Sequence, residues 1–234
     1  MALSVLQIIQ TVCRRIGVVA PNAVLGSTDS QIIQLLSISE EEGQELAARY
    51  TWQTLQKEAT FNTVATQIQT AISSITTGFK YIVNDTIWNR TLRRPVYGPS
   101  SEQEWQQKKA MQINGPFNSF RVIGDSINFY PVPAAGQSCY FEYITENWIS
   151  TSVSTTSPTW TNDADFPYLD DQIIILGTIW RFKQFKGLDY AEDFEKYERR
   201  VNDLMARDGS KPVLNMGGVS YDIKPGIWVP AGNW

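Results

Sequence analysis

Two consecutive helical patterns in the carboxyl-terminal half of the chain constrain the fold most strongly. From Asp165 to Gly209, apolar residues recur at spacings of three and four on both sides of Gly187, which should end the first helix. The first pattern is apolar around most of the cylinder and predicts a central helix. The second has a single apolar stripe opposite a charged face that carries Glu192, Glu195 and Arg199. We therefore expect the apolar side of the second helix to pack on the protein and the charged side to form a subunit contact.

The amino-terminal part of the chain adds two more helical patterns. The first ends at Gly17, and the second begins after a cap at Thr28 or Asp29. Each has an apolar face that needs a partner, and the helices of residues 165–209 offer one. The sequence therefore predicts an α+β fold in which residues 1–57 and 165–209 form an antiparallel four-helix bundle.

Between the two helical parts, the pattern changes to short alternating segments bounded by turn residues. Residues 58–149 are predicted to form a small antiparallel β-rich insertion, with a hairpin turn at Gly124-Asp125. Ser101 starts a capping-box pattern, which predicts one short helix inside this insertion. The composition of residues 150–164 is rich in Ser and Thr and predicts a flexible loop that returns to the bundle.

Residues 210–234 combine prolines and glycines with little helical or strand periodicity, which predicts an extended C-terminal arm. The arm has far more apolar surface than a solvated tail. Burying each large apolar side chain would stabilise a contact by roughly 1.5–3 kcal/mol. We therefore expect the arm to bind a partner protein or, alternatively, to lie as a strap across its own domain. Its candidate contact residues are Tyr221, Ile227, Trp228 and Trp234.

The absence of histidine removes the commonest general base near neutral pH and the commonest metal ligand. With 20 basic and 24 acidic residues, the formal net charge of -4 is not the footprint of a nucleic-acid-binding or membrane-binding protein. The sequence has no phosphate-binding loop, metal-ligand cluster or catalytic motif, so we predict no cofactor. It also lacks a signal-peptide pattern and an apolar run long enough to span a membrane.

Three stretches carry a resemblance to a known family. They read WRFKQFKGLDYAEDF from Trp180, RYTWQTLQKEATFNT from Arg49 and IWNRTLRRPVYGPSSEQEW from Ile87. An amino-terminal CRRIG followed by GSTDSQ accompanies them. Together these stretches resemble the head-to-tail adaptor proteins of short-tailed bacteriophages, also called connector or tail accessory proteins. The resemblance extends to about Gly218, and the stretch from Trp180 is its most specific part.

This resemblance implies a structural virion protein, assembled in the host cytoplasm, and not an enzyme. It implies a homo-oligomeric ring of twelve copies beneath the portal protein, to which the tail nozzle or tube protein docks. The ring would extend the DNA channel, and genomic DNA would pass through it without specific binding. The arm would engage the portal, which makes Tyr221, Ile227, Trp228 and Trp234 the matching portal-binding candidates. Two alternatives remain open, a carboxylate-dependent cell-wall hydrolase carried in the virion and another tail-tube component.

Overall fold

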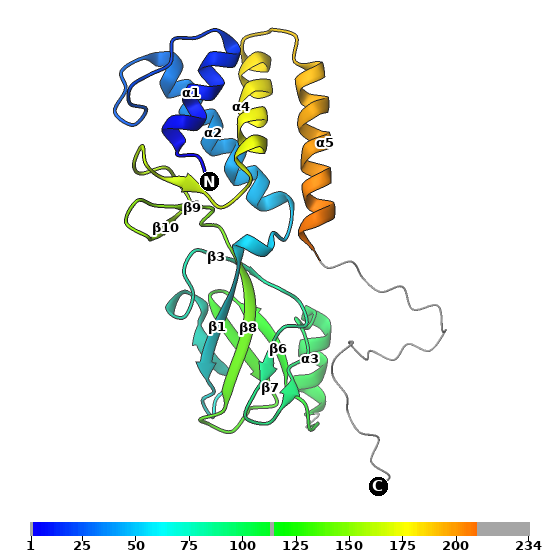
Figure 1. Ribbon diagram of the computed structural model, residues 1–234. Helices are drawn as coiled ribbons and strands as arrows, with labels where there is room; N and C mark the ends of the chain where they lie inside the picture. Colours follow the sequence, from blue (N-terminus) through cyan, green and yellow to red (C-terminus); the bar gives the residue numbers. More distant parts are fainter. Residues whose placement is uncertain (1, 113–114, 210–234) are drawn as a thin grey trace.

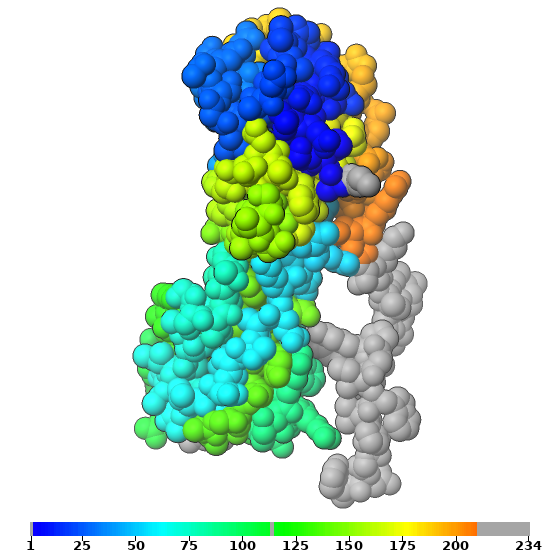
Figure 2. All heavy atoms as spheres, turned by 60° about the vertical axis from the view of Figure 1, so that its left-hand side comes forward, coloured from blue at the N-terminus to red at the C-terminus, as the bar shows by residue number. Residues whose placement is uncertain are grey.

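The computed structural model describes residues 2–112 and 115–209 of the chain. This part of the protein has two lobes, one mainly helical and one mainly β, stacked along a common long axis (Figure 1). Two stretches of chain connect the lobes, residues 50–55 and residues 146–148, and Figure 2 shows the cyan segment at their junction. Among the described helices, none is both long enough and apolar enough to span a bilayer.

The helical lobe is formed by the two ends of the described chain. Its helices are α1 (Val5–Ile16), α2 (Ser30–Arg49), α4 (Asp171–Phe185) and α5 (Ala191–Asp208). It also contains a small antiparallel sheet of three short strands, in the order β10 (Thr156–Ser157), β9 (Ile149–Ser150) and β11 (Phe166–Pro167).

The β lobe contains two antiparallel sheets and one helix. The larger sheet contains β1 (Gln56–Asn62), β8 (Ser138–Thr145), β3 (Phe79–Ile82), β4 (Trp88–Asn89) and β5 (Arg94–Pro95). The smaller sheet has the order β2 (Ile68–Ala71), β7 (Ser126–Tyr130) and β6 (Ser119–Ile123). Helix α3 (Glu102–Met111) and the short 3-10 helices η1 (Gln53–Leu55) and η2 (Ile72–Ser74) complete the elements.

Helix α4 is the centre of the helical lobe, because it packs against each of the other three helices there. Its isoleucines at positions 173, 174 and 175 are all fully buried although they point to different sides of the helix. Asp170 caps its first turn by accepting hydrogen bonds from the backbone N–H groups of Gln172 and Ile173. Because α4 is apolar on every side, other elements must pack all around it, and α1, α2 and α5 do so.

The prediction of a four-helix bundle with a small β insertion is wrong. Within residues 2–112 and 115–209 the protein has five α-helices and eleven strands, which form three antiparallel sheets. The β lobe is comparable in size to the helical lobe (Figure 1). In addition, the sheet of β9, β10 and β11 belongs to the helical lobe. Five of the strands are two residues long. Such strands are too short to show an alternating pattern, so sequence periodicity does not detect them.

The Ser/Thr-rich residues 150–164 contain β10 and the buried side chain of Trp160. The fully buried carboxylate of Asp165 organises this segment. It accepts hydrogen bonds from the backbone N–H groups of Ser152 at 3.0 Å, Thr161 at 2.8 Å and Asn162 at 2.8 Å. Hydrogen bonds to the charged form outweigh burial, so the pKa of Asp165 is lowered. The Asp165 carboxylate therefore fixes the backbone of a segment whose Ser/Thr-rich composition predicts a flexible loop.

Candidate interaction surfaces

Glu192, Glu195 and Arg199 lie on one exposed face of α5. Glu192 pairs with Lys196 at 2.7 Å and Glu195 pairs with Arg199 at 2.8 Å, each four positions apart along the helix. We call these four residues the charged face. Exposed pairs of this kind are screened by water and stabilise a helix only weakly. The charged face therefore contributes little to the stability of the lobe, although its side chains are available for contact with another protein.

The opposite side of α5 holds the helix against α4 and α2. Tyr197 and Val201 are buried on this side. Phe194 contacts Trp180 of α4 edge to face, with ring centroids 5.1 Å apart. Arg49, at the end of α2, donates to Glu198 at 2.7 Å. These contacts determine which side of α5 faces outward, and they turn the charged face away from the core.

A buried ion cluster joins α2 to α4 beneath α5. The Nε atom of Arg181 donates to Oε2 of Glu42 at 2.6 Å, and its two other nitrogens contact Glu41 and Glu45. The side chain of Glu42 is fully buried and that of Arg181 is 9% exposed. A planar guanidinium can serve several carboxylates at once, which a lysine cannot do in the same geometry. The cluster therefore fixes the register of α2 on α4, the helix on which α5 packs.

The environment of Glu42 is unusual for a carboxylate. Burial raises the pKa of its carboxyl group, while the nearby Tyr197 hydroxyl and Arg181 guanidinium act against the rise. Burial also raises the pKa of the Tyr197 hydroxyl, and the charge of Glu42 adds to this effect. Within the described residues, the Oε1 atom of Glu42 and the Tyr197 hydroxyl have no hydrogen-bond partner. Arg181 is therefore the charged neighbour that opposes this rise in the pKa of Glu42.

Apolar side chains are exposed where α4 turns into α5. Phe185 and Leu188 are 57% and 55% exposed, and Tyr190 and Phe194 are 37% and 40% exposed. Helical spacing predicts Tyr190 and Phe194 as packing residues, and both contact Trp180, yet a large part of each ring remains on the surface. This apolar corner lies at the end of the helical lobe furthest from the β lobe (Figure 1). It adjoins the charged face, and apolar surface with a charged border is typical of a protein contact.

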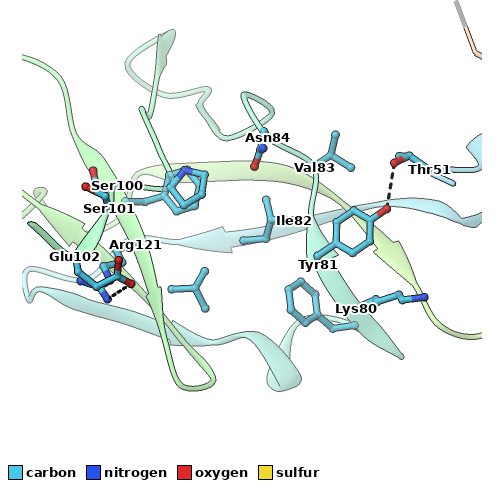
Figure 3. Close-up of a pocket in the computed structure, with 14 residues that line it drawn as sticks. Thr51, Lys80, Tyr81, Ile82, Val83, Asn84, Ser100, Ser101, Glu102 and Arg121 are labelled. Atoms are coloured by element: carbon cyan, nitrogen blue, oxygen red, sulfur yellow. Dashed lines mark hydrogen bonds and ion pairs between the residues drawn. The ribbon is translucent and has the colours of Figure 1, made fainter. Parts of the chain in front are cut away.

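The β lobe contains a groove of about 890 Å³ between β3 and the region of α3 and β6 (Figure 3). On the β3 side, the Tyr81 hydroxyl lies 3.1 Å from the Thr51 hydroxyl. On the other side, Arg121 pairs with Glu102 at 2.8 Å. No local sequence pattern predicts this groove, because its two sides come from separate stretches of the chain. The lining residues are Thr51, Phe79–Asn84, Pro99–Glu102 and Phe120–Val122.

A carboxylate-dependent hydrolase would need acidic side chains that are free to act, but Asp163, Asp170 and Asp171 have structural partners. Asp163 accepts a hydrogen bond from the backbone N–H of Leu25 at 2.8 Å. Asp170 caps α4, and Asp171 accepts from the N–H of Leu3 at 2.9 Å. Each of these groups holds a loop or a helix end in place. Their positions are therefore explained without a catalytic role.

The arm residues predicted to bind the portal lie outside the described part of the chain; they are Tyr221, Ile227, Trp228 and Trp234. The described chain ends next to the junction of the two lobes. Asp208, the last residue of α5, accepts a hydrogen bond from the backbone N–H of Gln53 at 2.9 Å. The position from which residues 210–234 begin is therefore known.

A family model described as SU10 adaptor protein matches residues 3–216 of the chain. The match includes both lobes, and therefore the charged face, the apolar corner and the groove. Comparison with curated proteins finds no match.

Proposed function

Since the chain belongs to the family of SU10 adaptor proteins, which are phage head-to-tail adaptors, we propose that it forms a ring joining the portal to the tail. In this proposal, the ring extends the DNA channel and presents the surface to which the tail nozzle or tube docks. The family match over nearly the whole chain is the observation that supports this function. The family is structural, so the proposal includes no catalytic role.

Neighbouring copies in a closed ring meet through two different faces of the subunit, because a ring requires a head-to-tail interface. We assign one of these faces to the charged face of α5 together with the adjoining apolar corner. The exposed aromatic and aliphatic side chains would provide buried area, and Glu192, Glu195 and Arg199 would set the register with the neighbour. Substitutions on this face should therefore impair ring formation without unfolding the subunit.

Reversing the charges at Glu192 and Glu195, as Glu192→Lys with Glu195→Lys, should reduce ring formation at least tenfold, about 1.4 kcal/mol per contact. The monomer should remain folded, because exposed ion pairs contribute little to the stability of a helix. Sedimentation of the protein mixed with portal measures the ring, and urea unfolding of the protein alone measures stability. Normal ring formation by the double variant would rule out this face as a subunit contact.

Two control variants accompany this experiment. Exchanging the partners, as Glu195→Arg with Arg199→Glu, keeps the pair within the helix but inverts the pattern presented to a neighbour, so it should also impair assembly. Glu58→Lys removes an exposed pair with Arg90 in the β lobe, where the two atoms lie 2.7 Å apart. This control changes charge on a different face and should leave ring formation unchanged.

Deleting residues 219–234 should abolish assembly onto the portal while both lobes stay folded. Among the described residues, one hydrophobic core gathers in the helical lobe and another in the β lobe, so neither core depends on the deleted residues for most of its side chains. The deletion removes Tyr221, Ile227, Trp228 and Trp234, the apolar side chains assigned to the portal. Co-purification with portal measures the effect, and the far-UV and near-UV circular dichroism spectra serve as the folding control. A truncated protein that still co-purifies with portal would refute the assignment.

A further inference from the structure

The groove of the β lobe is bordered by two strands. β3 pairs with β8 on one side, and β6 pairs with β7 on one side. In the part of the chain that the structure describes, no strand pairs with the other edge of β3, whereas residues 97–100 hydrogen-bond to the other edge of β6. An edge strand presents backbone N–H and C=O groups that can pair with an added strand. The groove therefore offers backbone hydrogen bonds to an extended segment.

The side chains of the groove are suited to a segment that is apolar on one face. Phe79, Ile82 and Val122 line the groove and pack against the core of the β lobe, yet all three remain partly exposed. Lys80 adds positive charge beside these apolar groups, whereas Arg121 is paired with Glu102, which also lines the groove. A matching segment would alternate apolar residues with polar ones and carry an acidic residue on its polar face.

Residues 210–234 begin beside this groove. Gln53 binds Asp208 at the end of α5, and Thr51, two residues before Gln53, lines the groove and contacts Tyr81 of β3. Gly209, which follows Asp208, lies close to Tyr50, since a Cβ atom at position 209 would be 2.9 Å from the Tyr50 hydroxyl. A connection from Gly209 to position 219 spans up to about 34 Å when extended. The chain after α5 therefore starts within easy reach of the open edge of β3.

One stretch of residues 210–234 has the pattern that the groove requires. Val219, Tyr221 and Ile223 alternate with Ser220 and Asp222, in the sequence VSYDI. Alternation with period two, with β-branched and aromatic residues on one face, is the signature of a half-buried strand. Its polar face carries an acidic residue that can approach the positive charge of the groove. The alternating apolar residues, the acidic Asp222 and the position where the chain leaves α5 all fit binding of residues 219–223 in the groove.

We infer that residues 219–223 of the same chain bind in this groove and add a strand to the free edge of β3 before the protein assembles. A tether this short gives the segment a high effective concentration at its own groove, which favours the same chain over a second copy. The contact goes beyond the proposed portal contact. It covers apolar side chains of the arm in the unassembled subunit, and assembly on the portal then has to release them.

Hydrogen–deuterium exchange on the full-length protein alone tests this inference. Val219→Ser with Ile223→Ser removes two apolar contacts and leaves Tyr221, which the portal proposal uses. We expect exchange of the backbone amides of residues 79–83 to become at least about tenfold faster than in the wild type. The matched control is Ile227→Ser with Trp228→Ser, which should leave this exchange unchanged but weaken portal binding.

Three results would overturn the inference. They are equal exchange at β3 in the wild type and the Val219/Ile223 variant, equal acceleration in the control, and wild-type protection that is lost on dilution. The last result would mean that a second copy supplies the strand. Because the exchange experiment contains no portal, its outcome is independent of whether residues 219–234 bind the portal.

Discussion

Arg181→Ala should lower the free energy of unfolding by about 3–5 kcal/mol, measured by urea unfolding at pH 7. Its guanidinium is the charged partner of the fully buried Glu42, at a distance of 2.6 Å between Nε and Oε2. The variant would leave this carboxylate without a charged partner in the interior. Glu41 and Glu45 are 56% and 55% exposed and can turn toward water, so most of the loss should come from Glu42.

A double variant separates the buried charge from the loss of packing. Replacing both partners, as Arg181→Met with Glu42→Met, fills the site with apolar side chains and leaves no uncompensated charge. This protein should be much more stable than Arg181→Ala, because apolar replacement of a buried pair is often close to neutral. Equal losses in the two proteins would show that packing, and not the charge of Glu42, accounts for the effect.

The effect of Arg181→Ala should also depend on pH. Burial raises the folded-state pKa of Glu42, and removal of the nearby positive charge raises it further. Such a carboxyl group binds a proton more readily in the folded state, so its contribution to stability falls as pH rises through the folded-state pKa. The deficit of the variant relative to the wild type should therefore shrink as pH is lowered toward about 4.3, the ordinary pKa of glutamate. A deficit that does not change with pH would contradict this explanation.

Gly43→Ala should lower the free energy of unfolding by about 2–3 kcal/mol, although alanine favours a helix by about 1 kcal/mol over glycine. A Cβ atom at position 43 of α2 would lie 2.2 Å from ring atoms of Trp148. The Trp148 ring is fully buried, and its Nε1 donates to the carbonyl of Pro158 at 3.0 Å, so it cannot turn aside without losing that bond. The midpoint of urea unfolding, with the slope checked for constancy, measures the loss.

Gly115→Ala is the matched control for this substitution. Among the described residues, a Cβ atom at position 115 would meet no heavy atom within 4 Å, and the residue is exposed. Its free energy of unfolding should stay within about 0.5 kcal/mol of the wild type. If Gly43→Ala were equally harmless, α2 and Trp148 would have to pack less closely than the structure shows.

The hydrogen-exchange and portal experiments address different states of the same arm. In the unassembled protein, we infer a contact between residues 219–223 and the groove. In the assembled particle, we propose that Tyr221, Ile227, Trp228 and Trp234 contact the portal. The order of the two contacts would keep apolar surface covered until the correct partner is present, which limits association through exposed apolar surface.

Local signals in the sequence predicted several helix ends correctly. Gly17 ends α1 with a positive φ of 78°, and Asp29 caps α2. Ser101 accepts from the N–H of Glu104 and starts α3. Each of these features depends on residues within about four positions, so the sequence contains the whole interaction. The charged face of α5 was located for the same reason, because helical spacing alone places Glu192, Glu195 and Arg199 together.

The sheets and the buried cluster could not be predicted in this way. A two-residue strand such as β9 has no period of its own and exists only because β10 and β11 pair with it. Arg181 and Glu42 are 139 positions apart and lie on two different helices. No local pattern connects the two residues. The wrong fold class and the unpredicted ion cluster therefore have one cause, which is that both depend on contacts between distant parts of the chain.

The sequence by itself therefore determined the helices α1, α2, α4 and α5, the end of α1 at Gly17, the cap of α2 and the charged side of α5, because these depend on short-range spacing. The tertiary structure alone decided the three sheets, the groove between β3 and β6, and the pairing of Arg181 with Glu42. It also decided that the apolar corner remains exposed, since burial depends on which elements lie nearby. Long-range contacts join residues whose separation along the chain carries no periodic signal, and only the folded chain brings them together.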